Sequence, residues 1–256
     1  MADLVNVAPG QCRLEYDSAT ALKLVRKNGA YMPLKISGAW QAKLVPSTPV
    51  TLSNAGHSAS TRYYIYAFDN AGVLTLEAST TGYVSDTDVG VMIKNGDPTR
   101  TLVGLAITNA SSQFQVQGKG TLSWFERRRQ INRLQTAAYF SGNSAAYTEV
   151  SSTLRVEVCC WADEHALGWY NTSGGANSGA DQWLAIYLNG STLRAEQYMG
   201  TAATVFGRTG LHCSTPGTEL AGQYLTLMRM ESATQFIVGN QTSNKMDTVA
   251  EVCVMG

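Results

Sequence analysis

The sequence predicts an all-β protein made of two β-sandwich or barrel-like domains, each built from antiparallel hairpins. Short runs of alternating apolar and polar residues recur along the chain with turn signals between them, which is typical of strands. No window of a dozen residues carries the apolar stripe of an amphipathic helix. Charged residues make up only 15% of the 256 residues and hydrophobic residues 44%, which suits sheets with uncharged polar outer faces around a proper core.

Three hairpins are the clearest local predictions. The Asn28-Gly29 and Asn189-Gly190 sequences suit a type I′ turn, because both central residues of that turn need positive φ. The predicted hairpins are residues 21–27 with 30–36, residues 62–68 with 73–77, and residues 182–188 with 191–198. Both faces of residues 182–188 are apolar, which predicts a central strand covered on each side.

Further strands are predicted at residues 90–94, 100–108, 121–125, 153–162, 202–211, 224–231, 235–240 and 246–254. The best helical segment, residues 125–134, is short and basic, and it divides the chain into domains at residues 1–130 and 131–256. The Gly-rich stretch of residues 171–179 predicts a long mobile loop inside the second domain.

No catalytic centre is predicted, because the nucleophile elbow and the phosphate-binding loop are both missing. A glycosidase needs two carboxylates about 5 to 10 Å apart. Asp86 with Asp88, and Asp163 with Glu164, are the pairs that could supply them. We interpret the first pair as a polar turn whose side chains accept hydrogen bonds from nearby amides. Calcium binding there is the alternative, although the full oxygen-rich loop is missing.

No metal site and no cofactor are predicted. A metal site needs several ligands that converge. His57 lies in a turn-like run, so a site would have to combine Asp163, His165, His212 and Cys213, and it would form only if their loops met.

The five cysteines have irregular spacings and form no C-x-x-C pair. They are Cys12, Cys159, Cys160, Cys213 and Cys253. We interpret them as buried free thiols, with an inter-chain disulfide as the alternative.

The numbers and positions of charged residues indicate which kinds of partner the chain can bind. With 19 basic and 19 acidic residues, the chain lacks the basic surplus that binds a nucleic-acid backbone. No apolar run approaches the roughly 20 residues that span a bilayer, so no membrane contact is expected. Arg127, Arg128 and Arg129 form a basic cluster that predicts contact with an acidic neighbouring subunit. A solvated linker or a nucleic-acid site is the alternative for this cluster.

Aromatic residues crowd the second half of the chain. Trp169, Tyr170 and Asn171 border the Gly-rich stretch and are the candidate residues for binding a sugar. Core packing is the alternative for Trp169 and Tyr170, and it is the interpretation that we favour.

Four segments of the first half carry a distinctive sequence type. They are residues 62–82 (RYYIYAFDNAGVLTLEASTTG), 90–104 (GVMIKNGDPTRTLVG), 108–114 (TNASSQF) and 122–128 (LSWFERR). With Cys12 and the Asn28-Gly29 turn, they resemble a sequence type found in tail-fibre-like, head-fibre or capsid-decoration and other virion proteins of tailed bacteriophages. The resemblance covers about residues 10–130, and the second half resembles no family.

The resemblance implies a virion protein, assembled in the host cytoplasm, with other virion proteins as partners and no enzymatic activity. A homo-oligomer is expected, with a trimer favoured. The first domain is the expected anchor, and the second is expected to project or bind. The leading hypothesis is a tail-fibre or receptor-binding component that attaches to a host surface glycan or protein. A capsid decoration or head-fibre protein is the alternative, and a polysaccharide depolymerase is the least favoured.

Overall fold

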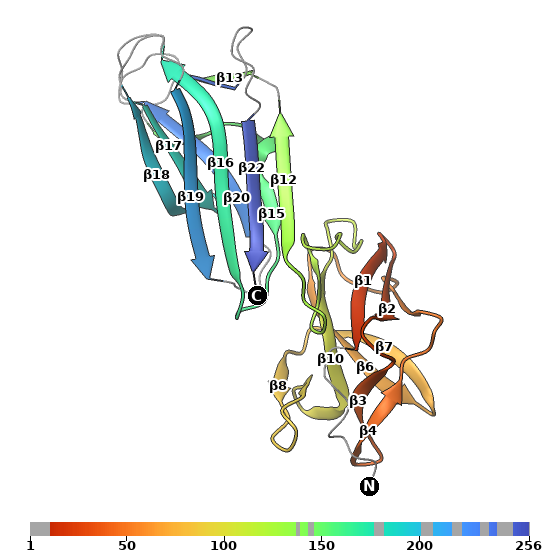
Figure 1. The fold of residues 1–256 in the computed structure, drawn as a ribbon. Coiled ribbons are helices and arrows are strands. Elements are labelled where there is room, and N and C mark those ends of the chain that lie inside the picture. The colour runs from red at the N-terminus through yellow and green to blue at the C-terminus, as the bar shows by residue number, and fades with distance from the viewer. Residues whose placement is uncertain are drawn as a thin grey trace. The chain divides into compact units, whose positions relative to one another are not determined.

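The computed structural model describes residues 11–136, 139–142, 146–176, 182–200, 207–216, 222–230, 236–239 and 248–255. The chain divides into two compact units, Met1–Arg128 and Arg129–Gly256 (Figure 1). In the described part, all paired strands named below run antiparallel, which confirms the predicted all-β class.

The described residues of unit 1 form three sheets. Its strands are β1 (Cys12–Ser18), β2 (Ala21–Arg26), β3 (Tyr31–Ile36), β4 (Ala39–Leu44), β5 (Val50–Ser53), β6 (Arg62–Asn70), β7 (Val73–Ser79), β8 (Tyr83–Ser85), β9 (Met92–Lys94), β10 (Asp97–Ile107) and β11 (Thr121–Ser123). One sheet has the order β1-β2-β5, a second is the two-stranded ribbon β3-β4, and the third has the order β7-β6-β10-β9-β8, with β11 paired to β10.

The core of unit 1 forms because alternate side chains of facing strands point inward. Leu14 of β1 and Leu24 of β2 are fully buried, and they belong to one apolar cluster with Ile65 of β6 and Val103 of β10. The buried Thr101 hydroxyl of β10 donates to the Pro33 carbonyl of β3 at 2.9 Å, which ties the ribbon to the large sheet.

The described residues of unit 2 form two antiparallel sheets that lie face to face (Figure 1). Its elements are β12 (Gln130–Thr136), β13 (Tyr139–Gly142), β14 (Thr148–Glu149), the short 3-10 turn η2 (Ser152–Leu154), β15 (Val156–Val158), β16 (His165–Ala176), β17 (Gln182–Leu188), β18 (Thr192–Gly200), β19 (Gly207–Pro216), β20 (Gly222–Met230), β21 (Phe236–Gly239) and β22 (Thr248–Met255). One sheet has the order β12-β22-β16-β21-β13 with β19 on β16, and the other has the order β14-β20-β17-β18 with β15 on β20.

Two of the predicted hairpins are confirmed. β6 pairs with β7 across a turn in which Ala71 and Gly72 have φ of 50° and 91°. β17 pairs with β18 across Asn189 and Gly190, with φ of 54° and 70°. β17 also pairs with β20, so the prediction that it is a central strand is confirmed.

The hairpin predicted around Asn28-Gly29 is wrong. Both strands exist, but β2 pairs with β1 and β5, while β3 pairs with β4. The chain changes sheets at this point, because the Lys27 N–H donates to the Gln11 carbonyl instead of closing a turn. The hairpin that does form turns at Ser37 and Gly38, where φ is 51° and 83°.

Two other predictions are corrected. The helix predicted over residues 125–134 is wrong, because Gln130–Thr136 forms strand β12 and pairs with β22. The loop predicted over residues 171–179 is wrong for residues 171–176, which continue β16, and residues 177–179 lie outside the described part. The Gly174 and Gly175 backbones pair with β21, so these glycines serve as strand residues.

Candidate functional site

One face of β6 carries a row of rings with a cation over each. The core-facing residues of β6 alternate with these, so the row lies on the opposite face of the sheet. The pairs are Arg62 over Tyr64 at 5.3 Å, Lys94 over Tyr66 at 6.0 Å and Arg100 over Phe68 at 3.8 Å, measured to the ring centroids. These distances are those of cation–π contacts.

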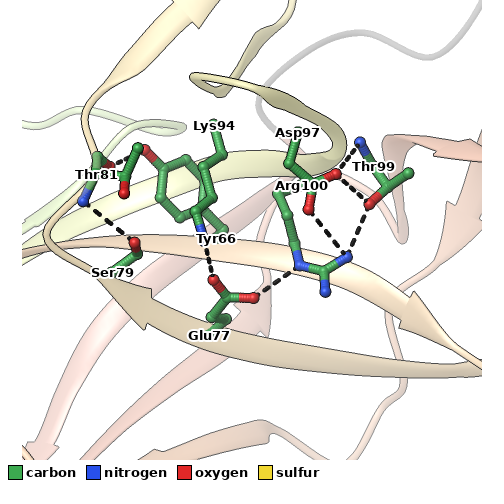
Figure 2. A network of polar contacts seen from close by, with 8 residues as sticks. All are labelled: Tyr66, Glu77, Ser79, Thr81, Lys94, Asp97, Thr99 and Arg100. Carbon is green, nitrogen blue, oxygen red and sulfur yellow. Dashed lines mark hydrogen bonds and ion pairs between the residues drawn. The ribbon is translucent and has the colours of Figure 1, made fainter.

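The cations of β9 and β10 are held by one carboxylate (Figure 2). The Lys94 ammonium donates to Oε1 of Glu77, and Nε of Arg100 donates to Oε2 at 2.7 Å. Arg100 also lies 3.8 Å from a carboxylate oxygen of Asp97, whose other oxygen accepts from the Thr99 hydroxyl at 2.6 Å. Glu77 therefore fixes both cations over their rings.

Both carboxyl groups of this network are ionised near neutral pH. Burial acts to raise the pKa of Glu77, but the hydrogen bonds from Lys94 and Arg100 outweigh it and lower the pKa below the ordinary 4.5. Burial also opposes ionisation of Asp97, and the hydrogen bonds from Thr99 together with the Arg100 charge lower its pKa. Neither group is suited to act as a general acid, which needs a raised pKa.

The row continues through two more rings. The Tyr64 and Tyr83 centroids are 5.5 Å apart, as are those of Tyr83 and Trp124, and the Arg127 guanidinium lies 4.3 Å from the Trp124 ring. We call the following set the cation–aromatic face: Arg62, Tyr64, Tyr66, Phe68, Tyr83, Lys94, Arg100, Trp124 and Arg127. Tyr, Trp and Arg are the residues enriched at protein interfaces.

Each arginine of the predicted cluster contacts a different residue. Arg127 packs on Trp124, while Arg128 lies 3.8 Å from the Glu126 carboxylate. Nε of Arg129 donates to the buried Cys253 sulfur at 2.9 Å. Contact of these arginines with an acidic neighbouring subunit stays a prediction.

The three candidate sugar-binding residues lie on β16. Tyr170 is only 1% exposed, whereas Trp169 and Asn171 are half-buried. Neighbouring residues of a strand point to opposite faces, so Trp169 and Asn171 share one face and Tyr170 lies on the other. The buried ring of Tyr170 agrees with the core-packing alternative, and it leaves Trp169 and Asn171 as the accessible pair.

The first carboxylate pair is a polar turn, as interpreted from the sequence. Oδ1 of Asp86 accepts hydrogen bonds from the Asp88 and Val89 amides at 3.0 and 3.2 Å, and its other oxygen lies 3.6 Å from the Lys35 ammonium. Burial acts to raise the pKa of Asp86, but the two amides and Lys35 lower it overall.

The second carboxylate pair does not converge on a cleft. Asp163 is exposed, while Glu164 is buried and accepts a hydrogen bond from the Trp161 amide at 2.8 Å. His165 begins β16, and the β16–β19 register places His212 opposite Trp169, four residues further along. Among the described side chains, no group of three metal-ligating residues comes together; those of His212 and Cys213 lie outside that part.

The cysteines whose side chains the structure describes are buried thiols that take part in no disulfide with one another. They are Cys12, Cys159, Cys160 and Cys253. Burial raises the pKa of Cys12 to about 12, so its thiol is unreactive at neutral pH.

Comparisons with known proteins give only a weak likeness. No family model and no curated protein matches the chain. Among solved structures, the chain is similar to that of the infectious bursal disease virus Gx strain, with 12% identity, a TM-score of 0.30, and coverage of 97% of this chain and 76% of that one. It is also similar to the VP2 subviral particle of that virus, with 11% identity, a TM-score of 0.28, and coverage of 98% and 84%. At TM-scores this low we infer neither fold nor function from the likeness.

No helix among the described residues has the length and apolar character needed to cross a membrane.

Proposed function

We propose that this chain is a structural protein of a tailed bacteriophage particle. One observation carries the proposal: the segments that resemble phage virion proteins are those that build the large sheet of unit 1 and its cation–aromatic face. Residues 62–82 include β6 and β7, residues 90–104 include β9 and most of β10, and residues 122–128 include Trp124 and Arg127. A shared sequence type that coincides with a shared scaffold is what a common anchoring module needs.

The finer proposal is a tail-fibre or receptor-binding component. Unit 1 would anchor the chain to other virion proteins. Tyr64 and Tyr66 of the cation–aromatic face are buried, so the contact would use its half-buried members, among them Arg100 and Trp124, which belong to residue types found at interfaces. Unit 2 would project and bind a host surface glycan or protein. Its support is the half-buried pair Trp169 and Asn171, which places an aromatic ring beside an amide on one face of β16.

A capsid decoration or head-fibre protein is the second candidate. The same anchor would then dock on the shell, and unit 2 would ornament or stabilise it. We propose no enzymatic activity, because the acidic pairs that the sequence offered are occupied locally at Asp86 and Glu164.

The test is immunogold electron microscopy of purified particles, with serum raised against the full chain. Label on the tail tip or baseplate supports the receptor-binding component. Even label over the head supports the decoration protein. If particles carry no label and mass spectrometry of their proteins does not find the chain, the virion proposal is overturned.

A further inference from the structure

The outer edge of β4 is an open strand edge. β3 and β4 form a ribbon of their own (Figure 1), and among the described residues no strand pairs with β4 on its far side. Soluble proteins usually cover or block such an edge, because its free N–H and C=O groups invite pairing with another strand.

The ribbon's register identifies the backbone groups that point outward. Opposite residues of an antiparallel pair alternate between those that exchange hydrogen bonds and those that do not. The Val45 N–H donates to the Ala30 carbonyl at 2.7 Å, so that pair exchanges hydrogen bonds. The next residue of β3, Tyr31, donates its N–H to the Gln11 side chain, and the Pro33 carbonyl accepts from Thr101, so neither group points at β4.

It follows that the residues opposite Tyr31, Pro33 and Lys35 direct their backbone groups away from β3. These residues are Leu44, Ala42 and Trp40. No hydrogen bond joins their N–H or C=O groups to any other group in the part of the chain that the structure describes. Leu44 and Ala42 are exposed, Leu44 by 48%.

Charge does not block this edge either. The Lys43 ammonium is bound by the Asp69 carboxylate and by the Gly72 carbonyl, and Lys35 lies 5.7 Å from the Trp40 ring centroid and 3.6 Å from Asp86. Both lysines of the ribbon therefore have carboxylate partners inside unit 1. The lysine that usually protects an edge strand is not directed at an incoming strand here.

The sequence of β4 is complementary to itself about Ala42. If a second β4 runs antiparallel with Ala42 facing Ala42, the apolar Trp40 lies opposite Leu44, and Gln41 lies opposite Lys43. No two like charges face each other in this register, and the smallest side chain lies on the two-fold axis. The outward groups of Trp40, Ala42 and Leu44 then meet one another, which gives roughly six backbone hydrogen bonds.

We propose that β4 is a self-association edge, which pairs antiparallel with β4 of a second copy about a two-fold axis at Ala42. The pairing also places the exposed Leu44 beside Trp40 of the second copy. It does not depend on the virion function, and it is separate from any contact through the cation–aromatic face. A contact of this size is weak, so it acts at high local concentration.

The test uses charge at the axis, on the full chain. Ala42 is exposed, so Ala42→Lys and Ala42→Glu are expected to fold normally, but each places two like charges face to face across the proposed axis. Sedimentation velocity over a concentration series is expected to show that the association step weakens by roughly tenfold or more in each variant. An equimolar mixture of the two variants is expected to restore it, because the introduced lysine of one chain then faces the introduced glutamate of the other.

The control is Val73→Lys, which places the same charge at a 65% exposed position on the edge strand β7 and is expected to leave association unchanged. A wild-type chain that does not self-associate overturns the proposal. So does association that neither Ala42 variant weakens. If both variants weaken it but their mixture does not restore it, β4 contacts a different part of the second copy, and antiparallel β4–β4 pairing about Ala42 is overturned.

Discussion

The outer edges of β1 and β4 differ in how their backbone groups are satisfied. Both strands lie at the edge of a sheet in unit 1. The outward amides of Leu14 and Tyr16 in β1 donate to the Ser123 hydroxyl at 3.0 Å and to the Gln117 side-chain oxygen at 3.2 Å. The outward N–H and C=O groups of β4 have no hydrogen-bond partners among the described residues.

We call the outer edge of β1 the closed edge, because side chains accept hydrogen bonds from its outward amides. The difference from β4 shows where the fold needs such acceptors. Leu14 is fully buried in the core of unit 1, and a buried amide without an acceptor would be costly. The chain therefore brings Ser123 from 109 residues away to close this edge. β4 lies in a largely exposed arm of the ribbon, where water satisfies its backbone until another strand does.

The largest expected effect on stability comes from a side chain at Gly104 of β10, which lies against Leu14 of β1 and Leu122 of β11. A Cβ at this position would collide with the Leu122 carbonyl and the Leu14 side chain, and the Leu122 carbonyl belongs to the backbone and cannot rotate away. Gly104→Ala is expected to lower the free energy of unfolding by about 1–3 kcal/mol, measured by urea denaturation. Gly82→Ala is the control, because the nearest atom to its Cβ is 3.9 Å away, and an equal loss in both variants would contradict the account.

Ser123→Ala tests the closing hydrogen bond itself. It leaves the buried Leu14 amide without its acceptor, which is expected to cost about 1–3 kcal/mol. Hydrogen exchange is expected to speed up at the Leu14 amide. Ser18→Ala, at an exposed hydrogen bond to Thr20, is the control, and unchanged exchange at Leu14 would show that Ser123 does not close the edge.

The sequence predicted strands better than it predicted their partners. Alternating apolar residues identified both β2 and β3, because that pattern depends only on which side chains face a core. Which strands pair depends on contacts between distant segments. The Asn-Gly turn signal at residues 28–29 wrongly suggested that β2 pairs with β3. The true turn at Ser37 and Gly38 carries a weaker signal, although it needs positive φ at both positions.

The candidate site was predicted only in part. The sequence pointed to Arg127, but it did not connect this residue to Tyr64 and Tyr83, which lie more than 40 positions earlier in the chain. The alternation in residues 62–68, with rings on both faces, was the available signal for a row of rings on the face of β6 opposite the core cluster. The open edge of β4 had no signal of its own, because an edge is defined by the strand that is missing beside it.

Lowering the pH is expected to reduce the stability that the ion pairs of the cation–aromatic face contribute, and to leave the contribution of the Ser123–Leu14 hydrogen bond unchanged. Because the pKa of Glu77 is lowered in the folded state, its stabilisation is complete above the ordinary pKa of 4.5 and is lost as pH falls through the lower folded value. Glu77→Gln is expected to cost about 1 kcal/mol at neutral pH and progressively less in acid. The cost of Ser123→Ala involves no titrating group, so urea denaturation at several pH values should find it constant; a parallel decline in both costs would contradict this separation.

The smallest effect on stability is expected at Arg128, and it bears on which surface meets a neighbour. Its side chain is 59% exposed and its guanidinium lies 3.8 Å from the Glu126 carboxylate, so Arg128→Ala is expected to change the free energy of unfolding by less than about 0.5 kcal/mol. If an acidic neighbouring subunit binds this arginine, the variant is expected to be depleted from purified particles in a quantitative immunoblot even though it is stably folded. Ala42→Lys in the same assay shows whether incorporation also depends on the open edge of β4. Depletion of the Arg128 variant alone would mean that the chain is anchored near Arg128 and that β4 pairing is a separate contact between copies, whereas normal incorporation of this variant would remove Arg128 as a subunit contact.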